Sequence, residues 1–212
     1  MVERNGHRAA GARASTVTLH VQGDGLPRFA EAVADLGSSK ARRAFIRALN
    51  HTGRKAQTGV VRALAKQVGL PQGRLRDLGR IRGVSAEHSG GEPAFLIRST
   101  GRHLPLGEFR PVQFGYGVRA NPWGRAQRFE GAFIFAGHRR SGQRMPSGNV
   151  FFNSRRFNPA SGRNNLALPM WGPAIPKEMV QGESAAAFRR IAPELGDRVR
   201  HEIRRLTDGA VT

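Results

Sequence analysis

A regular apolar stripe between Ser38 and Val68 predicts one long amphipathic helix. Apolar and small side chains recur there every three to four residues, at Ala41, Phe45, Ala48 and Leu49, Thr52, Ala56, Val60, Ala63 and Leu64, and Val68. This period lets a helix bury one face. Residues 69–71, Gly-Leu-Pro, predict its end. Gly53 and Gly59 each cost about 1 kcal/mol relative to alanine inside a helix, so we expect a kink or break there.

Shorter elements are predicted on both sides of this helix. Residues 16–21 alternate in polarity, which favours a strand, and residues 26–37 have the pattern of a short helix. The leucines and isoleucine of residues 75–81 indicate one more short basic helix. An apolar stripe over residues 183–206 predicts a C-terminal amphipathic helix. We expect a break near Pro193, because proline cannot continue the hydrogen-bond ladder.

A period of two replaces the helical period in the middle of the chain. Residues 112–119 alternate between large apolar residues and polar or glycine residues, which predicts one half-buried strand. Residues 93–99, 131–137 and 149–153 are further strand candidates. Because 131–137 is apolar on both faces, we expect it to be a central strand. Phe109, Phe114, Phe133 and Phe151 are expected to belong to the core.

These patterns predict an α+β fold with basic N-terminal helices, a central, mainly antiparallel β-sheet or barrel-like block, and a C-terminal amphipathic helix. We expect residues 1–25 to be a flexible basic arm, because the segment starts with an aperiodic run rich in Ala, Gly and Arg. Residues 26–212 then form a single domain, with a helical part at 26–83, a β part at 84–175 and the C-terminal helix at 176–212.

The charge of the chain is strongly positive and unevenly placed. The 212 residues include 35 Lys and Arg against 15 Asp and Glu, a formal net charge of +20. Residues 38–83 carry twelve basic side chains and one acidic, while residues 176–212 are almost balanced. Such an excess predicts a polyanion or an acidic protein as partner. The candidate DNA- or partner-facing residues are Arg43, Arg47, Arg54, Lys55, Arg62 and Lys66 on the long helix, and Arg139, Arg140 and Arg144 in the loop 137–148.

Each of these features has a plainer interpretation as well. The basic helix can lie along phosphates or form a solvated face opposite an acidic subunit. The loop 137–148 can contact DNA, fold on assembly or be a simple exposed hairpin tip. Trp123 and Trp171 stand in loops next to proline and glycine, where they can anchor an interface or pack over the edge of their own core.

Catalytic chemistry has little support in the sequence. There is no cysteine, and the histidines never pair at metal-ligand spacing: they are His7, His20, His51, His88, His103, His138 and His201. Acidic residues of the β part, Glu87, Glu92, Glu108 and Glu130, form no local cluster of the kind a metal-dependent nuclease needs. We therefore expect no enzyme activity, no metal and no cofactor. No run of 18 apolar residues is present, so no membrane-spanning helix is expected.

Several short segments, taken in order, resemble the prophage minor tail protein Z family, the tail completion proteins of tailed phages. The resemblance covers about residues 38–181. It rests on the order and spacing of Arg43-Ala44-Phe45-Ile46-Arg47-Ala48-Leu49-Asn50-His51-Thr52, Gly69-Leu70-Pro71, Leu104-Pro105-Leu106 with Phe109, Gly117-Val118, Gly131-Ala132-Phe133-Ile134, Val150-Phe151, and Leu168-Pro169 with Trp171-Gly172-Pro173. The chain departs from the family in its N-terminal arm and in residues 152–159.

The resemblance implies a structural virion protein that is assembled in the host cytoplasm and sits at the head-proximal end of the tail. It implies a homo-oligomeric ring of six copies, contacts with neck and tail proteins such as a tail terminator, tube or head–tail connector, and double-stranded DNA in transit. The alternative is a free nucleic-acid-binding protein without sequence preference, whose isolated form would bind naked DNA in a salt-sensitive way.

Overall fold

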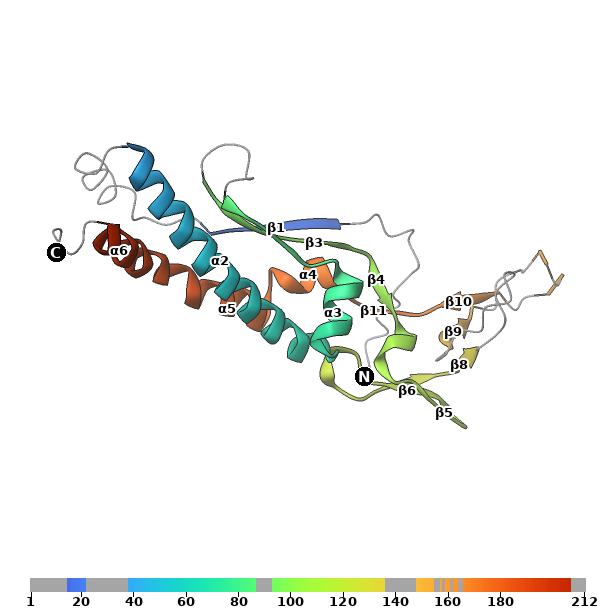
Figure 1. The fold of residues 1–212 in the computed structure, drawn as a ribbon. Coiled ribbons are helices and arrows are strands. Elements are labelled where there is room, and N and C mark those ends of the chain that lie inside the picture. Colours follow the sequence, from blue (N-terminus) through green and yellow to red (C-terminus); the bar gives the residue numbers. More distant parts are fainter. Residues whose placement is uncertain are drawn as a thin grey trace.

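The computed structural model describes residues 15–21, 38–86, 93–135, 148–154, 157, 159–160, 162–163 and 166–206. These residues form an α+β fold with an elongated outline, in which long helices lie at one end and short strands project at the other (Figure 1). The helix predicted over 26–37 and the loop 137–148, apart from Gly148, lie outside the described residues.

The long helix α2 (Ser38–Val68) is confirmed and is continuous through both glycines. Its predicted stripe is buried from Phe45 to Val68, with Leu49, Val60 and Leu64 fully enclosed. The predicted kink is wrong because both glycines are points of close packing. A Cβ atom at Gly53 would lie 2.1 Å from Cγ of Phe95, and one at Gly59 would lie 2.6 Å from Cδ1 of Ile191.

The end of α2 follows the sequence prediction. Gly69 adopts a left-handed φ of 81°, and the N–H groups of Gly69 and Leu70 both donate to the carbonyl of Ala65, at 3.0 and 3.1 Å. This is the geometry that glycine supplies at a helix C-terminus. The short helix α3 (Gln72–Gly79) begins directly afterwards and buries Leu75.

The C-terminal part is helical with the predicted break. Helix α4 (Ile175–Met179) precedes α5 (Gly182–Ile191), and a short 3₁₀ segment, η4 (Ala192–Glu194), separates α5 from α6 (Leu195–Leu206). Pro193 lies in that segment, as expected. Both α5 and α6 pack along α2, and the figure shows the three helices as one layer (Figure 1). Val199 and Ile203 bury the inner face of α6.

A three-stranded sheet covers the other side of α2. Its order is β1 (Ser15–Val21), β3 (Phe95–Gly101) and β2 (Arg82–Val84), with antiparallel pairing throughout. Strand β1 pairs with β3 along seven residues, from Ser15 opposite Gly101 to Val21 opposite Phe95. The strand predicted over 16–21 is therefore confirmed, and it lies inside the segment 1–25 that was expected to be a flexible arm.

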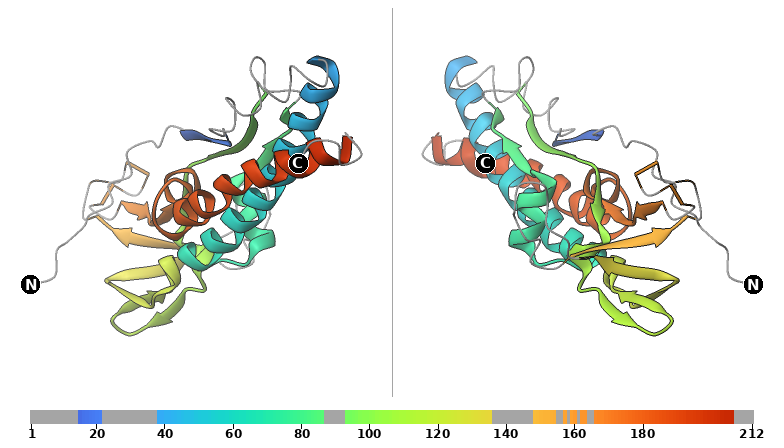
Figure 2. Two further views of the ribbon diagram at one scale, coloured as in Figure 1. Left: turned by 90° about the vertical axis from the view of Figure 1, so that its left-hand side faces the viewer. Right: turned by 90° about the vertical axis from the view of Figure 1, so that its right-hand side faces the viewer.

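Two further small sheets project away from the helices (Figure 2). One contains β5 (Val112–Phe114), β6 (Gly117–Ala120) and β7 (Gln127–Glu130); the other contains β8 (Ala132–Phe135), β9 (Asn149–Asn153) and β10 (Ala167–Pro169). We call these six strands the β tip. Strand β4 (His103–Pro105), paired with β11 (Trp171–Ala174), connects it to the helical part, and the 3₁₀ turns η2 (Leu106–Phe109) and η3 (Pro122–Gly124) flank it.

The β part differs from its prediction in the path of residues 112–119, in the exposure of Phe114 and in the position of β8. Residues 112–119 form a hairpin that turns at residues 115–116, next to Gly117, whose left-handed φ of 143° favours glycine. Phe114 is therefore exposed, whereas Phe109 is buried as expected. Strand β8 lies at the edge of its sheet and β9 at the centre. Among the described residues the strands form several small open sheets and no closed barrel.

Candidate functional site

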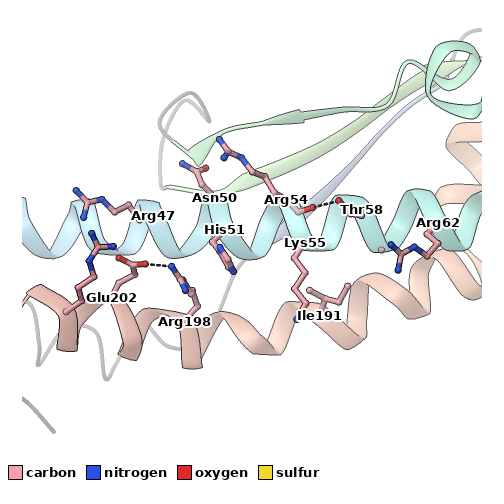
Figure 3. Close-up of a pocket in the computed structure, with 12 residues that line it drawn as sticks. Arg47, Asn50, His51, Arg54, Lys55, Thr58, Arg62, Ile191, Arg198 and Glu202 are labelled. Atoms are coloured by element: carbon pink, nitrogen blue, oxygen red, sulfur yellow. Dashed lines mark hydrogen bonds and ion pairs between the residues drawn. The ribbon is translucent and has the colours of Figure 1, made fainter. Parts of the chain in front are cut away.

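A basic groove runs along the seam between α2 and the helices α5 and α6. It has a volume of about 920 Å³. Six cationic side chains and one carboxylate line it, together with polar and small residues: Arg47, Asn50, His51, Arg54, Lys55, Thr58, Gly59, Arg62, Ile191, Arg198, Glu202 and Arg205. Figure 3 shows Lys55 pointing from α2 toward α5, and Arg198 and Glu202 reaching from α6 toward α2. The positive charge of two helices thus meets in one place.

The spacing of the arginines follows from helix geometry. Arg47, Arg54 and Arg62 are seven and eight residues apart, which is close to two helical turns, so they recur along one side of α2 at intervals of roughly 10–12 Å. Arg198 and Arg205 repeat at seven residues on α6. Gly59 lets the Ile191 side chain approach α2 closely, which brings the two helices together at the groove floor.

One buried carboxylate organises the α6 side of the groove. Glu202 is only 2% exposed, and its Oε1 accepts a hydrogen bond from Nη2 of Arg198, one turn earlier on the same helix. Among the described residues, Oε2 of Glu202 and Nε of Arg198 have no hydrogen-bond partner. The carboxylate holds the partly exposed guanidinium in place, because the Glu202 charge alone would be costly to bury.

The predicted basic residues divide into three groups. Arg47, Arg54, Lys55 and Arg62 line the groove, while Arg43 and Lys66 lie on α2 outside its lining. Lys55 also forms an ion pair with Glu194 of η4. The three loop arginines, Arg139, Arg140 and Arg144, lie outside the described residues. Sequence reasoning missed His51, Arg198 and Arg205, although the seven-residue repeat of the last two was a usable signal.

The two predicted tryptophans, Trp123 and Trp171, lie outside the groove lining. Trp123 of η3 is half-buried, and its indole N–H donates to Oε1 of Glu178 at 2.9 Å. Nε2 of Gln67 donates to the other oxygen, Oε2, at 2.8 Å, and the Gln67 Oε1 atom accepts from the backbone N–H of Ser184 at 3.2 Å. We call these four residues the Glu178 network. Trp171 is also half-buried and pairs, in β11, with Pro105 of β4.

The Glu178 carboxylate is held ionised by its neighbours. Burial of the side chain raises its pKa, but the hydrogen bonds from Trp123, Gln67 and Gln181 and the charge of Lys177 outweigh that cost and leave the pKa below its ordinary value of 4.5. Because both oxygens accept hydrogen bonds from inside the chain, this carboxylate joins α2, η3 and α4, and Gln67 extends the network to Ser184 of α5. Trp123 therefore uses its polar edge within the fold, despite an unfavourable left-handed φ of 56°.

The β tip carries most of the exposed large apolar side chains of the described structure. Six of the seven lie in it or beside it, namely Val112, Phe114, Tyr116, Phe135, Phe152 and Phe157, whereas Val180 lies at the end of α4. The Phe114 and Tyr116 rings stack at 5.3 Å. The side chain of Gln113 joins the two sheets, because its Oε1 accepts from the N–H of Ile134 at 2.9 Å while its Nε2 donates to the carbonyl of Gly117.

The described residues hold neither a metal cluster nor a membrane-spanning helix. No three or more His, Asp or Glu side chains lie together as a metal ion would require. No described helix combines the length and apolar character needed to span a membrane. Comparison of the chain with protein-family models, with curated proteins and with solved structures gave no match.

Proposed function

We propose that this protein is a structural component of a tailed-phage virion, a tail completion protein that forms a ring at the head-proximal end of the tail. There it helps to join the tail to the head and lets DNA pass. The ordered motifs between residues 38 and 181 suggest the family, and the α+β fold is compatible with it. The observation that carries the proposal is the exposed aromatic surface of the β tip.

The β tip has the composition of an assembly surface. Phe135 is 58% exposed and Phe152 43% exposed, in strands of four and five residues. Monomeric proteins seldom expose large apolar side chains in such a group, and groups of this kind mark interaction sites. Aromatic residues are also enriched at the centres of protein interfaces. In the proposed ring, neighbouring copies bury these rings against each other.

The charge of the chain fits the same arrangement. A ring of molecules with a net charge of +20 each would repel itself unless DNA or acidic neighbours compensate the charge. The basic groove lies on the helical part and the aromatic surface on the β tip, so one can face a polyanion while the other contacts the next copy (Figure 1). The proposed partners are five further copies, the adjoining neck and tail proteins, and DNA in transit.

A second candidate function is that of a free nucleic-acid-binding protein without sequence preference. The basic groove favours it, because cationic grooves bind phosphate backbones without any need for assembly. The two functions differ in where the protein resides. A tail completion protein is part of the particle in a fixed, small number of copies, while a free binding protein is distributed along nucleic acid in the cell.

Localisation in purified particles tests the proposal. Antibodies against the chain, coupled to gold and viewed by electron microscopy, are expected to label the junction of head and tail. Removal of the gene should leave filled heads and separate tails. Label found only on material outside the particles, with joined particles forming normally in its absence, would contradict the proposal and favour the free binding protein.

A further inference from the structure

We infer that the basic groove between α2 and α6 is a binding site for the phosphate backbone of double-stranded DNA. This deepens the proposed function and rests on it for the presence of DNA beside the protein. Sequence reasoning left open whether the basic helix faces DNA or an acidic protein, and it assigned no role to α6. The chemistry of the assembled groove distinguishes between these partners.

The cations that line the groove are mostly arginines. Five of the six cationic side chains are arginines, contributed by α2 and α6: Arg47, Arg54, Arg62, Arg198 and Arg205. The planar guanidinium matches the oxygens of a phosphate in a bidentate manner, which is why arginine dominates phosphate recognition. Arg198 is held toward the groove by Glu202, so part of its ordering cost is met before any ligand binds.

The described lining of the groove holds few apolar or aromatic groups. The imidazole of His51 is its one aromatic ring, it has no Phe, Tyr or Trp, and its single large apolar side chain is Ile191. A groove that binds an acidic peptide would be expected to hold apolar or aromatic anchors, because these carry most of the affinity in protein interfaces. A groove for single-stranded nucleic acid would be expected to stack bases on aromatic rings. A duplex backbone needs only cations and hydrogen-bond donors.

The positive charge is presented over a length that suits a duplex. The stretch from Arg47 to Arg62 spans roughly 22 Å along α2. Double-stranded DNA carries one negative charge per ~1.7 Å of its axis when both strands are counted, so a row of arginines of this length lies opposite several phosphates. None of the groove side chains forms a base-reading set, which suits a DNA that must slide past.

Fluorescence anisotropy with a labelled mixed-sequence duplex tests the inference on the full-length chain. The groove triple is Arg47→Gln, Arg54→Gln and Arg62→Gln, three exposed side chains of α2. Glutamine keeps the helix propensity close to that of arginine. The control triple is Arg76→Gln, Arg102→Gln and Arg125→Gln, which are also exposed and lie outside both the groove lining and the β tip. Both proteins lose the same charge, and circular dichroism checks that both fold.

The expected result is a difference between the two triples. The groove triple should bind the duplex at least about tenfold more weakly at low salt, and its salt dependence should fall by about 0.9 in slope for each arginine removed. The control triple should stay close to wild type. Equal weakening of both triples overturns the inference, because net charge alone would then explain binding. Polyglutamate binding lost in the groove triple, with duplex binding unchanged, overturns it in favour of an acidic protein.

Failure of this inference is distinguishable from failure of the proposed function. A groove triple that binds DNA like wild type removes the groove assignment, while gold labelling at the junction of head and tail leaves the virion role standing. Groove-dependent DNA binding without any label on particles supports the groove and removes the virion role. If DNA slides past the groove, we expect the complex of protein and duplex to have a dissociation constant of ~10⁻⁴–10⁻⁶ M at physiological salt, the range of non-specific binding.

Discussion

The helical part and the β tip bury their apolar residues to very different degrees. In the helical part the stripe of α2 is enclosed by α5, α6, α4 and the sheet β1–β3–β2. In the β tip two three-stranded sheets, with strands of three to five residues, leave many of their large side chains exposed. Small sheets need a partner to cover an apolar face. The helical part thus buries its apolar stripe within a single chain, and we propose that assembly covers the exposed side chains of the β tip.

The largest effect is expected at the contact that holds α2 against the sheet. Gly53→Ala would place a methyl group 2.1 Å from Cγ of the buried Phe95 ring, so α2 and β3 must separate. We expect a loss of about 3 kcal/mol in the free energy of unfolding, the upper end of the usual cost of overpacking. Gly73→Ala in α3 is the matched control, since nothing lies within 4 Å of its Cβ position. Equal urea midpoints for the two variants would contradict this packing.

The next effect concerns the Glu178 network, which joins the helical part to η3. Glu178→Ala leaves the Trp123 indole N–H without its acceptor and leaves Nε2 of Gln67 with only the backbone carbonyl of residue 178, and we expect a loss of about 2 kcal/mol. Glu183→Gln, an exposed change in α5, should cost less than about 0.5 kcal/mol. Thermal unfolding measures both. A Glu178→Ala protein as stable as the Glu183 variant would show that the network contributes nothing.

The same carboxylate predicts a pH dependence. Because the pKa of Glu178 is lower in the folded chain than its ordinary value of 4.5, its stabilisation is complete above that value and is lost as pH falls through the folded pKa. Glu178→Gln cannot titrate, so the stability advantage of wild type over this variant should shrink as the solution becomes more acidic than pH 4.5. An advantage that stays constant or grows in that range would contradict the assignment.

A smaller effect tests the β tip as an assembly surface. Phe152→Thr in β9 removes an aromatic ring that is 43% exposed and keeps a strand-forming residue. Val180→Thr removes an equally exposed apolar side chain, 44%, outside the β tip. We expect the first variant to weaken self-association about tenfold, or ~1.4 kcal/mol, and the second to leave it unchanged. If both variants associate like wild type, the β tip is not the contact.

The smallest effect is expected from the ion pair between α3 and η2. Arg74 donates from Nε and Nη2 to the two oxygens of Glu108, at 2.9 and 2.7 Å. The hydrogen bond and charge of Glu108 raise the pKa of Arg74, but both side chains are partly exposed. A double-mutant cycle with Arg74→Ala and Glu108→Ala should give a coupling energy of about 0.5 kcal/mol that falls with salt. A coupling energy several times larger would mean that this ion pair contributes strongly to holding α3 against η2.

Local patterns predicted the helical part well and the β part poorly, for physical reasons. The stripe of α2 and its end at Gly69 depend on neighbours within a few residues, so they are visible in the sequence. The alternation over 112–119 was mistaken for one strand because a hairpin with Gly115 at its turn keeps the same period of two. Alternation in a strand shows that two faces differ but not which neighbours cover them, so it could not predict that Phe114 is exposed.

The candidate site was half predictable. Arg47, Arg54 and Arg62 stand out on the sequence because acidic residues are absent from α2. Arg198 and Arg205 were missed because their sequence neighbours are acidic as well as basic, and only the packing of α6 on α2 brings them to the groove. Trp123 could not be assigned either, since its partner Glu178 is 55 residues away in the sequence.

Sedimentation velocity of a fluorescent duplex with the full-length protein tests the division between the two regions most directly, because it reports oligomer size and bound DNA together. We expect Phe152→Thr to give smaller complexes that still carry DNA. The groove triple should keep the wild-type protein assembly and lose DNA. The control triple should match wild type in both. Loss of DNA binding in Phe152→Thr, or a groove triple that dissociates into smaller species while retaining DNA, would contradict the assignment of assembly to the β tip and of DNA binding to the groove.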